Sequence, residues 1–583
     1  MKHKRISVLV LIAIILFTTI GCQREEDKPV EALNTNTDEP TEHEPEYGGQ
    51  LVLPLTTLYT LNPLITENAS YYYFSKLIFE CLFELDKDLN IINQLADDYT
   101  INEDGSIDIR LKKGVKWHDG EEFTAEDVAF TINTIKHADE DTTYKKIWQS
   151  IAGAFGSKNI NRIMDVEIID DYNIKVIFDG NFSHGLEALT FPIIPRHRFV
   201  SGRENRNSYS AALEKEDYIP IGTGPYKFVD YEKYKSVTLE AFDGYRDGRP
   251  YIHRIIGKIL EDDELALTAF ETGQVDLVTT LGTDWEKFDQ NNRVRIFEFV
   301  SQNYEFLGFN FSKEIFSREN ANRLRKAIAY GIDRQAIIQR VYLGHATQTD
   351  LPIHPDSWLL TEDANVYGYN LNKAKEELEK LGWRDLDGDG FYEDENGQKI
   401  SLRLLTNSYN PLRLKVADMI VEDLNKLGLH VVKDYPETIP SNLTDEMVEG
   451  QWEEGNVRLE KGDYDIVLMG WHLSPVPELS LFFHSNQISS NINFIRYSNE
   501  AMDDALYQAF NALGRDSKKR AYNRLQTIII EELPYVSLFF KNRALLIDKK
   551  IMGDIDPNFH NIYRNIDKWY IPKEFQQKLV ENE

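Results

Sequence analysis

Residues 401–432, SLRLLTNSYNPLRLKVADMIVEDLNKLGLHVV, form the clearest structural unit of the sequence. The apolar run 402–405 predicts a strand, and Pro411 marks the start of a helix that Gly428 ends. A second strand is expected at 429–432, and a third apolar run, 465–469, follows after a polar, glutamate-rich insertion. Strand, helix and strand in this order predict a right-handed crossover and a mainly parallel sheet.

Polar and aromatic side chains follow these strands. Asn407 and Tyr409 come after the first strand, and Trp471 comes after the third. In open α/β sheets, ligands bind at the carboxyl ends of the strands. We therefore predict that these three residues belong to a ligand site.

Elsewhere the sequence also predicts a mixed α/β protein. Alternating apolar residues indicate strands at 107–111 and 237–241. Thr124 followed by Asp127 is typical of a helix start, and further helices are expected at 322–330, 334–343 and 371–381.

The composition limits the classes of function. The chain has 583 residues, 42% of them apolar, and 65 basic against 96 acidic residues give a net charge of -31. At about 150 residues per domain, this length suggests two to four domains. A chain this acidic repels phosphate backbones, so we expect no nucleic-acid partner. Of the two cysteines, Cys81 sits in an apolar run and is expected to be a buried small side chain.

The first residues indicate export. Lys2, Lys4 and Arg5 precede an apolar run at 6–20, which is shorter than the roughly 20 residues that span a bilayer. Residues 1–21 are therefore predicted to be a signal peptide, with an uncleaved membrane anchor as the alternative. The small residues before Cys22 resemble a bacterial lipobox, which implies that Cys22 is lipidated. Two acyl chains give stable attachment to the cell membrane.

Residues 22–46 are acidic, contain three prolines and have little apolar surface. We expect them to form a flexible tether, with the folded body starting near Tyr47. Together these features predict an extracytoplasmic protein that is lipid-anchored to the bacterial cell membrane.

Eight pieces of the sequence carry a family resemblance. The main one is LKKGVKWHDGEEFTAEDVAFTINT at 111–134. The others fall in order along the chain: GGQL at 48, LNP at 61, GTGPY at 222, ETGQVDL at 271, LGFNFS at 307, RKAIAYGIDR at 325 and NFIRYSNEAMDDAL at 493. From residue 47 to about 571 the chain resembles the family 5 extracellular solute-binding proteins of peptide and nickel ABC importers.

This resemblance implies an α/β, two-lobed periplasmic-binding-protein-like fold that closes over its ligand by a hinge. Lobe one would combine 47–77, 188–300 and 545–575. An extra subdomain would cover 78–187, and lobe two would cover 301–544. The two chain crossings, near 302–310 and 541–546, would form the hinge.

The resemblance also implies candidate ligand contacts. Glu67, Asn68, Ala69 and Ser70 match a segment whose backbone pairs with an extended peptide as an added strand, and an ordinary surface loop is the alternative. Asn303 and Tyr304 at a crossing, and Tyr144 in the subdomain, are candidate cleft residues. Aromatic walls suit a peptide pocket, although core packing is the competing interpretation for each aromatic residue.

The segment GWHLSPVPELSLFFHS at 470–485 departs from the family. Many peptide receptors have an aspartate shortly after this tryptophan that holds the α-ammonium group of the peptide. Here Ser474 and Val476 occupy the corresponding places, and Glu478 is the only nearby acid. Either Glu478 replaces the aspartate or the ligand lacks a free amino terminus. Trp471 is predicted to line the cleft, with core packing as the alternative.

A second motif, DLDGDGFYEDENG at 385–397, follows the calcium-loop pattern. Asp385, Asp387 and Asp389 alternate and a glycine occupies the sixth place. Position twelve is Asn396, so the usual glutamate is missing; Glu393, Asp394 or Glu395 could substitute. The alternative is a solvated turn. No cofactor is required, and a bound calcium ion would be structural.

These features predict a lipid-anchored, monomeric receptor that delivers oligopeptides to the permease subunits of an ABC importer. It is not expected to be an enzyme, because the chain lacks GxSxG, HExxH and Walker motifs. The alternatives are a receptor for a nickel chelate, with His472 as the suggestive ligand, or for another solute such as an oligosaccharide. A receptor that only senses peptides and a secreted hydrolase are further alternatives.

Overall fold

The computed structural model describes residues 44–155, 163–281, 285–288, 292–407, 409–436 and 444–576. The residues from Pro45 onward belong to one compact unit. The predicted signal peptide 1–21, Cys22 and nearly all of the tether 22–46 lie outside the described residues. Among the described residues, we find no helix with the length and apolar character needed to cross a membrane.

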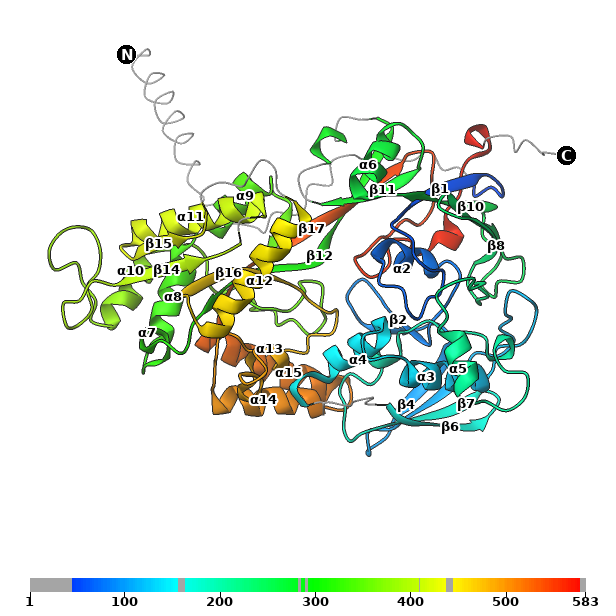
Figure 1. The fold of residues 1–583 in the computed structure, drawn as a ribbon, viewed down its shortest axis with the longest axis horizontal. Helices are drawn as coiled ribbons and strands as arrows, with labels where there is room; N and C mark the ends of the chain where they lie inside the picture. Colours follow the sequence, from blue (N-terminus) through cyan, green and yellow to red (C-terminus); the bar gives the residue numbers. More distant parts are fainter. Residues whose placement is uncertain are drawn as a thin grey trace, which may run out of the picture. The chain divides into compact units, whose positions relative to one another are not determined.

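The unit that starts at Pro45 is mixed α/β (Figure 1). Its first four-stranded sheet draws on distant parts of the chain. β1 runs parallel to β10, while β9 is antiparallel to both β10 and β8. The sheet order is β1 (Gln50–Thr56), β10 (Arg254–Leu260), β9 (Ser236–Ala241) and β8 (Tyr226–Glu232). β9 confirms the strand predicted at 237–241. Helices α2 (Ala69–Ser75) and α6 (Asp263–Glu271) both contact β1 of this sheet.

The second sheet lies within the range predicted for the subdomain and is antiparallel throughout. Its order is β4 (Ala96–Ile101), β5 (Ile107–Leu111), β7 (Asn173–Phe178) and β6 (Ile163–Asp170). β5 confirms the predicted strand at 107–111. Helix α3 (Ala125–His137) begins after Thr124, whose N–H donates to the Asp127 carboxylate at 2.9 Å. This is the predicted helix start. The same region contains β2 (Phe83–Leu85), β3 (Ile91–Asn93), α4 (Thr143–Ala152) and η1 (Gly153–Phe155).

The third sheet has seven strands and carries the unit first recognised in the sequence. Its order is β11 (Leu277–Leu281), β17 (Tyr535–Asp548), β12 (Val294–Phe309), β16 (Ile466–His472), β14 (Ser401–Leu405) and β15 (His430–Asp434), with β13 (Ala346–Gln348) on β17. β14 is parallel to both β15 and β16, as predicted. The sheet as a whole is mixed, not mainly parallel, because β11, β12 and β17 pair in antiparallel fashion.

Helix α11 (Pro411–Leu427) follows β14 as the sequence predicts. Asn410 caps its start by accepting from the N–H groups of Leu412 and Arg413, and Gly428 ends it in the left-handed conformation with φ of 104°. The predicted helices at 322–330, 334–343 and 371–381 are also present. They are α8 (Asn322–Gly331), α9 (Arg334–Val341) and α10 (Leu371–Lys380).

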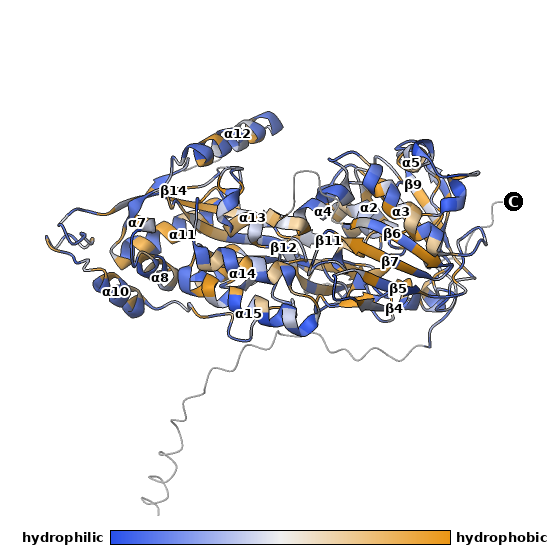
Figure 2. Cartoon of the chain, turned by 90° about the horizontal axis from the view of Figure 1, so that it is seen from below, coloured by the Kyte–Doolittle hydropathy of each residue, from blue (hydrophilic) through white to orange (hydrophobic). Residues whose placement is uncertain are grey.

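The glutamate-rich stretch between β15 and β16 was predicted only as a polar insertion. It contains a 17-residue helix, α12 (Asp445–Lys461), in which Leu459 is the buried residue among those described. Figure 2 shows this helix mostly in the hydrophilic colour. The remaining helices are α5 (Arg206–Ala212), α7 (Glu314–Ser317), α13 (Ser480–Phe483), α14 (Glu500–Asn511) and α15 (Arg515–Glu532), with short 3-10 turns η2 (Glu187–Leu189), η3 (Arg196–Arg198), η4 (Glu286–Phe288), η5 (Ser485–Gln487), η6 (Ile566–Lys568) and η7 (Lys573–Phe575).

The buried apolar residues divide into separate cores, in agreement with a two-lobed fold. The largest core combines residues between 51 and 277 with residues 545–571, and Val476 and Phe510 join it from another part of the chain. Two further cores contain only residues between 304 and 540. Along the chain, the cores change between Val294 and Tyr304 and between Phe540 and Ala544. Cys81 lies in the region of the first core, buried and free, and burial raises the pKa of its thiol to about 12.

Candidate functional site

The two longest strands, β12 and β17, pass through both halves of the body. They pair up to Val300 and Asn542, and pairing resumes at Tyr304 and Phe540. From Asn303 onward, β12 also pairs with β16, which lies on the side of β12 opposite β17. The interruption separates residues of the first core from those of the other two. The ladder between β12 and β17 is therefore broken by a register shift at this place.

A buried charge cluster lies just beyond this interruption. Glu305 of β12 is 2% exposed and accepts from the Arg413 guanidinium of α11 at 2.7 and 2.9 Å. The Lys541 ammonium of β17 lies at 2.7 Å from the same carboxylate. Burial alone would raise the pKa of Glu305, but Lys541 and Arg413 together hold it below its usual value. The cluster therefore joins β12, β17 and α11 beside the interruption.

Gly470 of β16 faces this cluster across the ladder with β12. A Cβ atom at Gly470 would lie 2.7 Å from the Arg413 guanidinium and 2.9 Å from the Tyr304 carbonyl oxygen. The glycine of the GWHLSP segment thus leaves the space that the guanidinium occupies.

A cavity of about 300 Å³ lies at the end of β14 and beside the first half of β16, against α12. Asn407 and Met469 line it from the strand side, and Trp452 lines it from the helix. The Asn407 side-chain oxygen is buried and has no hydrogen-bond partner among the described residues. The carboxyl end of β14 therefore borders a cavity, and the Asn407 side-chain oxygen lies there.

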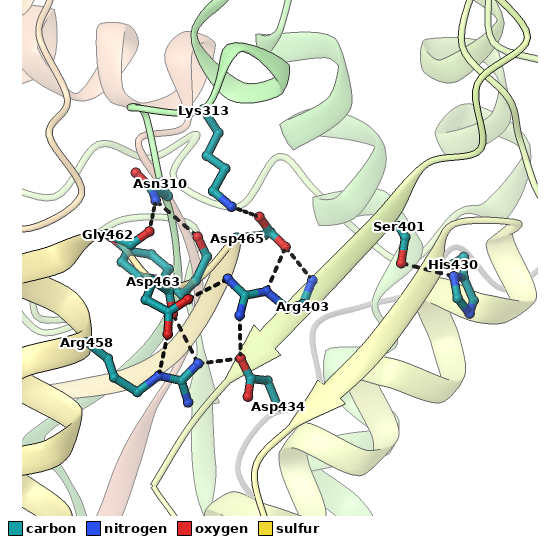
Figure 3. Close-up of polar contacts among 11 residues, drawn as sticks. Asn310, Lys313, Ser401, Arg403, His430, Asp434, Arg458, Gly462, Asp463 and Asp465 are labelled. Atoms are coloured by element: carbon teal, nitrogen blue, oxygen red, sulfur yellow. Dashed lines mark hydrogen bonds and ion pairs between the residues drawn. The ribbon is translucent and has the colours of Figure 1, made fainter.

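An ion-pair network joins the last turns of α12 to β14 and β15 (Figure 3). Arg403 of β14 binds Asp463 at 2.9 Å and Asp434 at 3.4 Å. Arg458 of α12 binds the same two carboxylates, at 3.4 Å and 2.5 Å respectively. The hydrogen bond from Arg403 lowers the pKa of Asp463. The Lys313 ammonium adds an ion pair with Asp465, which follows α12 in the sequence.

Trp471, at the end of β16, is half-buried. Its ring stacks on Phe306 at 6.1 Å between centroids and contacts Phe482 at 5.2 Å. The neighbouring His472 is exposed, and its ring lies 3.3 Å from the side-chain oxygen of Asn303. The structure thus brings Trp471, His472 and Asn303 together at the interruption of β12. Tyr409 is half-buried in the loop before α11.

Two of the candidate aromatic residues are in the core. Tyr304 is fully buried, its hydroxyl lies 2.6 Å from the Ser537 hydroxyl, and its ring stacks on Phe306. Tyr144 is 6% exposed and contacts Phe191 edge-on. In this structure both are packing residues, which was the competing interpretation.

The segment Glu67 to Ser70 is only partly extended. Asn68 caps α2 by accepting from the Tyr71 N–H, and α2 already begins at Ala69. Ala69 and Ser70 are therefore helical, not extended, which leaves Glu67 and Asn68 for any added-strand pairing. Glu67 is exposed and forms an ion pair with Lys146 of α4 at 2.6 Å.

Glu478 is buried at a contact that the sequence did not predict. One carboxylate oxygen accepts from the Ser480 N–H at 2.8 Å, and the other lies 3.6 Å from the ring of His184. Burial holds the pKa of His184 well below its usual value. The Glu478 side chain is only 8% exposed. Its contact with His184 joins the region predicted as lobe two to the region predicted as the subdomain.

Further contacts join the same two regions. The Ala154 N–H donates to the Ser480 hydroxyl at 2.7 Å, and Lys518 of α15 binds Glu187 at 2.5 Å. Gly153 makes the close approach possible, because a Cβ atom there would lie 2.4 Å from the Ser480 hydroxyl oxygen. These residues are far apart in sequence and carry no shared motif. Sequence reasoning therefore had no signal for them.

Residues 90–493 match the model of the bacterial extracellular solute-binding proteins, family 5. The chain belongs to this family. This confirms the resemblance drawn from the sequence motifs, and the two-lobed α/β fold agrees with it.

Individual relatives align with most of this chain. The oligopeptide-binding protein AppA of Bacillus subtilis is 29% identical over 97% of this chain and 98% of its own length. The heme-binding protein A of Haemophilus influenzae is 26% identical over 85% of this chain and 87% of its own. The structure of B. subtilis AppA in complex with a nonapeptide matches with a TM-score of 0.60 and 26% identity, covering 91% of this chain and all of that one. NikZ of Campylobacter jejuni, solved with Ni(L-His), shares the fold, with a TM-score of 0.63 and 24% identity over 89% and 99% of the two chains.

Proposed function

We propose that this family 5 protein is an extracytoplasmic receptor that binds oligopeptides and delivers them to an ABC importer. The single observation that carries the proposal is the interrupted pairing of β12 and β17 between separate cores, in a chain whose relative of nearly equal length is an oligopeptide-binding protein. Rotation about the interruption would close the lobes over a peptide. Because the permease need recognise only the closed form, binding energy would shift the population toward delivery.

The proposed peptide site lies at the carboxyl ends of β14 and β16, next to the interruption. Trp471 and Asn303 would contribute to it, and Asn407 has a buried oxygen ready to accept from a peptide N–H. Tyr409 is a further candidate there. Glu478 is engaged by Ser480 and packs beside His184, which argues against its holding a peptide ammonium group in this conformation.

The rest of the proposal concerns attachment and partners. Cys22 would carry the lipid, 22–46 would be the tether, and the permease subunits would be the membrane partners. The lobe boundaries 47–77, 188–300 and 545–575, the subdomain 78–187, and lobe two 301–544 remain predictions. The largest core contains residues of both the predicted lobe one and the predicted subdomain. We propose that the protein acts as a monomer and transfers its ligand unchanged.

The ligand class can be tested by native mass spectrometry of the full chain before and after denaturation. Peptides released intact would support the proposal. Release of a nickel chelate, haem or an oligosaccharide would overturn it, and cleaved products from added peptides would indicate a hydrolase.

Trp471→Leu should weaken binding of a captured peptide by about tenfold or more, since large aromatic anchors dominate binding energy. Isothermal titration would measure the affinity, and circular dichroism would verify the fold. Tyr234→Ala is the matched control, because Tyr234 is 75% exposed at the turn between β8 and β9 and distant in sequence from the site. Equal affinities of the Trp471 variant and the parent would place Trp471 in the core and not in the site.

A further inference from the structure

The loop between α10 and β14 folds around one buried acid. Glu393 is 3% exposed, and its backbone forms bridges with both Arg384 and Lys399. Arg384 and Glu393 exchange two backbone hydrogen bonds, of 3.1 and 2.8 Å. The calcium-like motif thus closes on itself with the Glu393 carboxylate inside.

Three carboxylates converge in this loop. One oxygen from each of Asp385, Asp387 and Glu393 lies within 4.8 Å of the others. One Glu393 oxygen, Oε2, accepts from the Leu386 N–H at 2.7 Å. Its other oxygen, Oε1, is buried and has no hydrogen-bond partner among the described residues. A buried carboxylate oxygen without a partner is costly, and a bound cation would remove that cost.

The third aspartate of the motif has a different neighbour. Asp389 forms an ion pair with Lys399, which also contacts Asp387 at 3.2 Å. Glu393 therefore occupies the place in the cluster that the sequence pattern assigned to Asp389. Lys399 thus neutralises part of the charge of Asp387 and Asp389.

We propose that Asp385, Asp387 and Glu393 bind a calcium ion that clamps this loop onto the end of lobe two. The donors are all carboxylate oxygens, which suit a hard cation and not zinc or copper. Calcium accepts irregular coordination by oxygens at variable distances, whereas magnesium demands near-ideal octahedral geometry and keeps several waters. The ion would stabilise the connection between α10 and β14, independently of the peptide site.

The experiment uses the full chain, stripped with a chelator and titrated with calcium chloride by calorimetry. The parent should bind one calcium ion and unfold at a higher temperature when it is bound. Glu393→Gln keeps the shape of the side chain but removes its charge, and should weaken binding by about tenfold or more. Should this variant fold poorly, Asp387→Asn at an exposed position serves the same purpose.

Glu395→Gln is the matched control. Glu395 is an exposed acid of the same loop that pairs with Arg318 and stands outside the three-carboxylate cluster, so its loss should change the calcium affinity by less than twofold. Lys399→Gln should strengthen binding, because the lysine competes for Asp387. Absence of calcium binding by the parent, equal effects of the Glu393 and Glu395 variants, or a preference for magnesium would each overturn the proposal.

Discussion

Glu305→Gln should lower the free energy of unfolding by about 3 kcal/mol, the lower end of the range for breaking a buried ion pair. The substitution leaves the Arg413 and Lys541 side chains, 14% and 17% exposed, without their shared carboxylate. Urea unfolding followed by tryptophan fluorescence at pH 7 would measure the loss. Glu298→Gln, at an exposed position of the same strand, is the control and should change stability by no more than about 0.5 kcal/mol.

The same cluster predicts a dependence on pH. The pKa of Glu305 in the folded protein is held below the ordinary value of 4.5. Its contribution to stability is therefore complete above pH 4.5 and is lost as the pH falls through the folded pKa. The difference in stability between parent and Glu305→Gln should shrink as the pH is lowered below 4.5. A difference that stays constant with pH, or a variant as stable as the Glu298 control, would contradict the assigned role of the carboxylate.

Gly222→Ala should be at least as damaging. A Cβ atom at Gly222 would lie 1.8 Å from the backbone oxygen of Ile78, and backbone cannot move aside as a flexible side chain can. That oxygen also accepts from the Gly224 N–H at 2.9 Å, so displacing it breaks a second contact of the GTGPY segment. We expect a loss of about 3 kcal/mol or more, at the upper end for overpacked interiors.

Thermal unfolding of the purified variant would measure this loss, with soluble yield as a second readout. Gly202→Ala is the matched control, because a Cβ atom there meets nothing within 4 Å and the backbone needs no left-handed conformation. That substitution should stay within about 0.5 kcal/mol of the parent. Similar midpoints for the two variants would show that Ile78 can shift at little cost.

The sequence could predict the parts of this fold that depend on local pattern. Helix α11 starts at Pro411 and ends before Gly428, as the sequence predicts. The mixed pairing of the seven-stranded sheet was missed, because the antiparallel partners of β16 and β12 come from distant segments. Helix α12 was missed because it buries little of its surface, so its apolar residues follow no clear period.

The candidate site shows the same limit. Trp471 and Asn407 could be found because they follow recognisable strands. Glu305 could not be assigned a role, since its partners Arg413 and Lys541 lie 108 or more residues away. A charged residue within the apolar strand YEFLGF was the one available signal. In the acidic loop the pattern suggested the ion, but only the fold distinguished the buried Glu393 from its less buried neighbours Asp394 and Glu395.

The division of the cores has a consequence for biosynthesis. The largest core needs Leu545, Ile547 and Trp569, close to the end of the chain, whereas two other cores are complete by residue 540. During vectorial emergence from a ribosome or a translocation channel, the earliest-made part must wait for the latest. We therefore expect the middle of the chain to fold first. A premature stop before residue 545 should leave the core of the amino-terminal half incomplete.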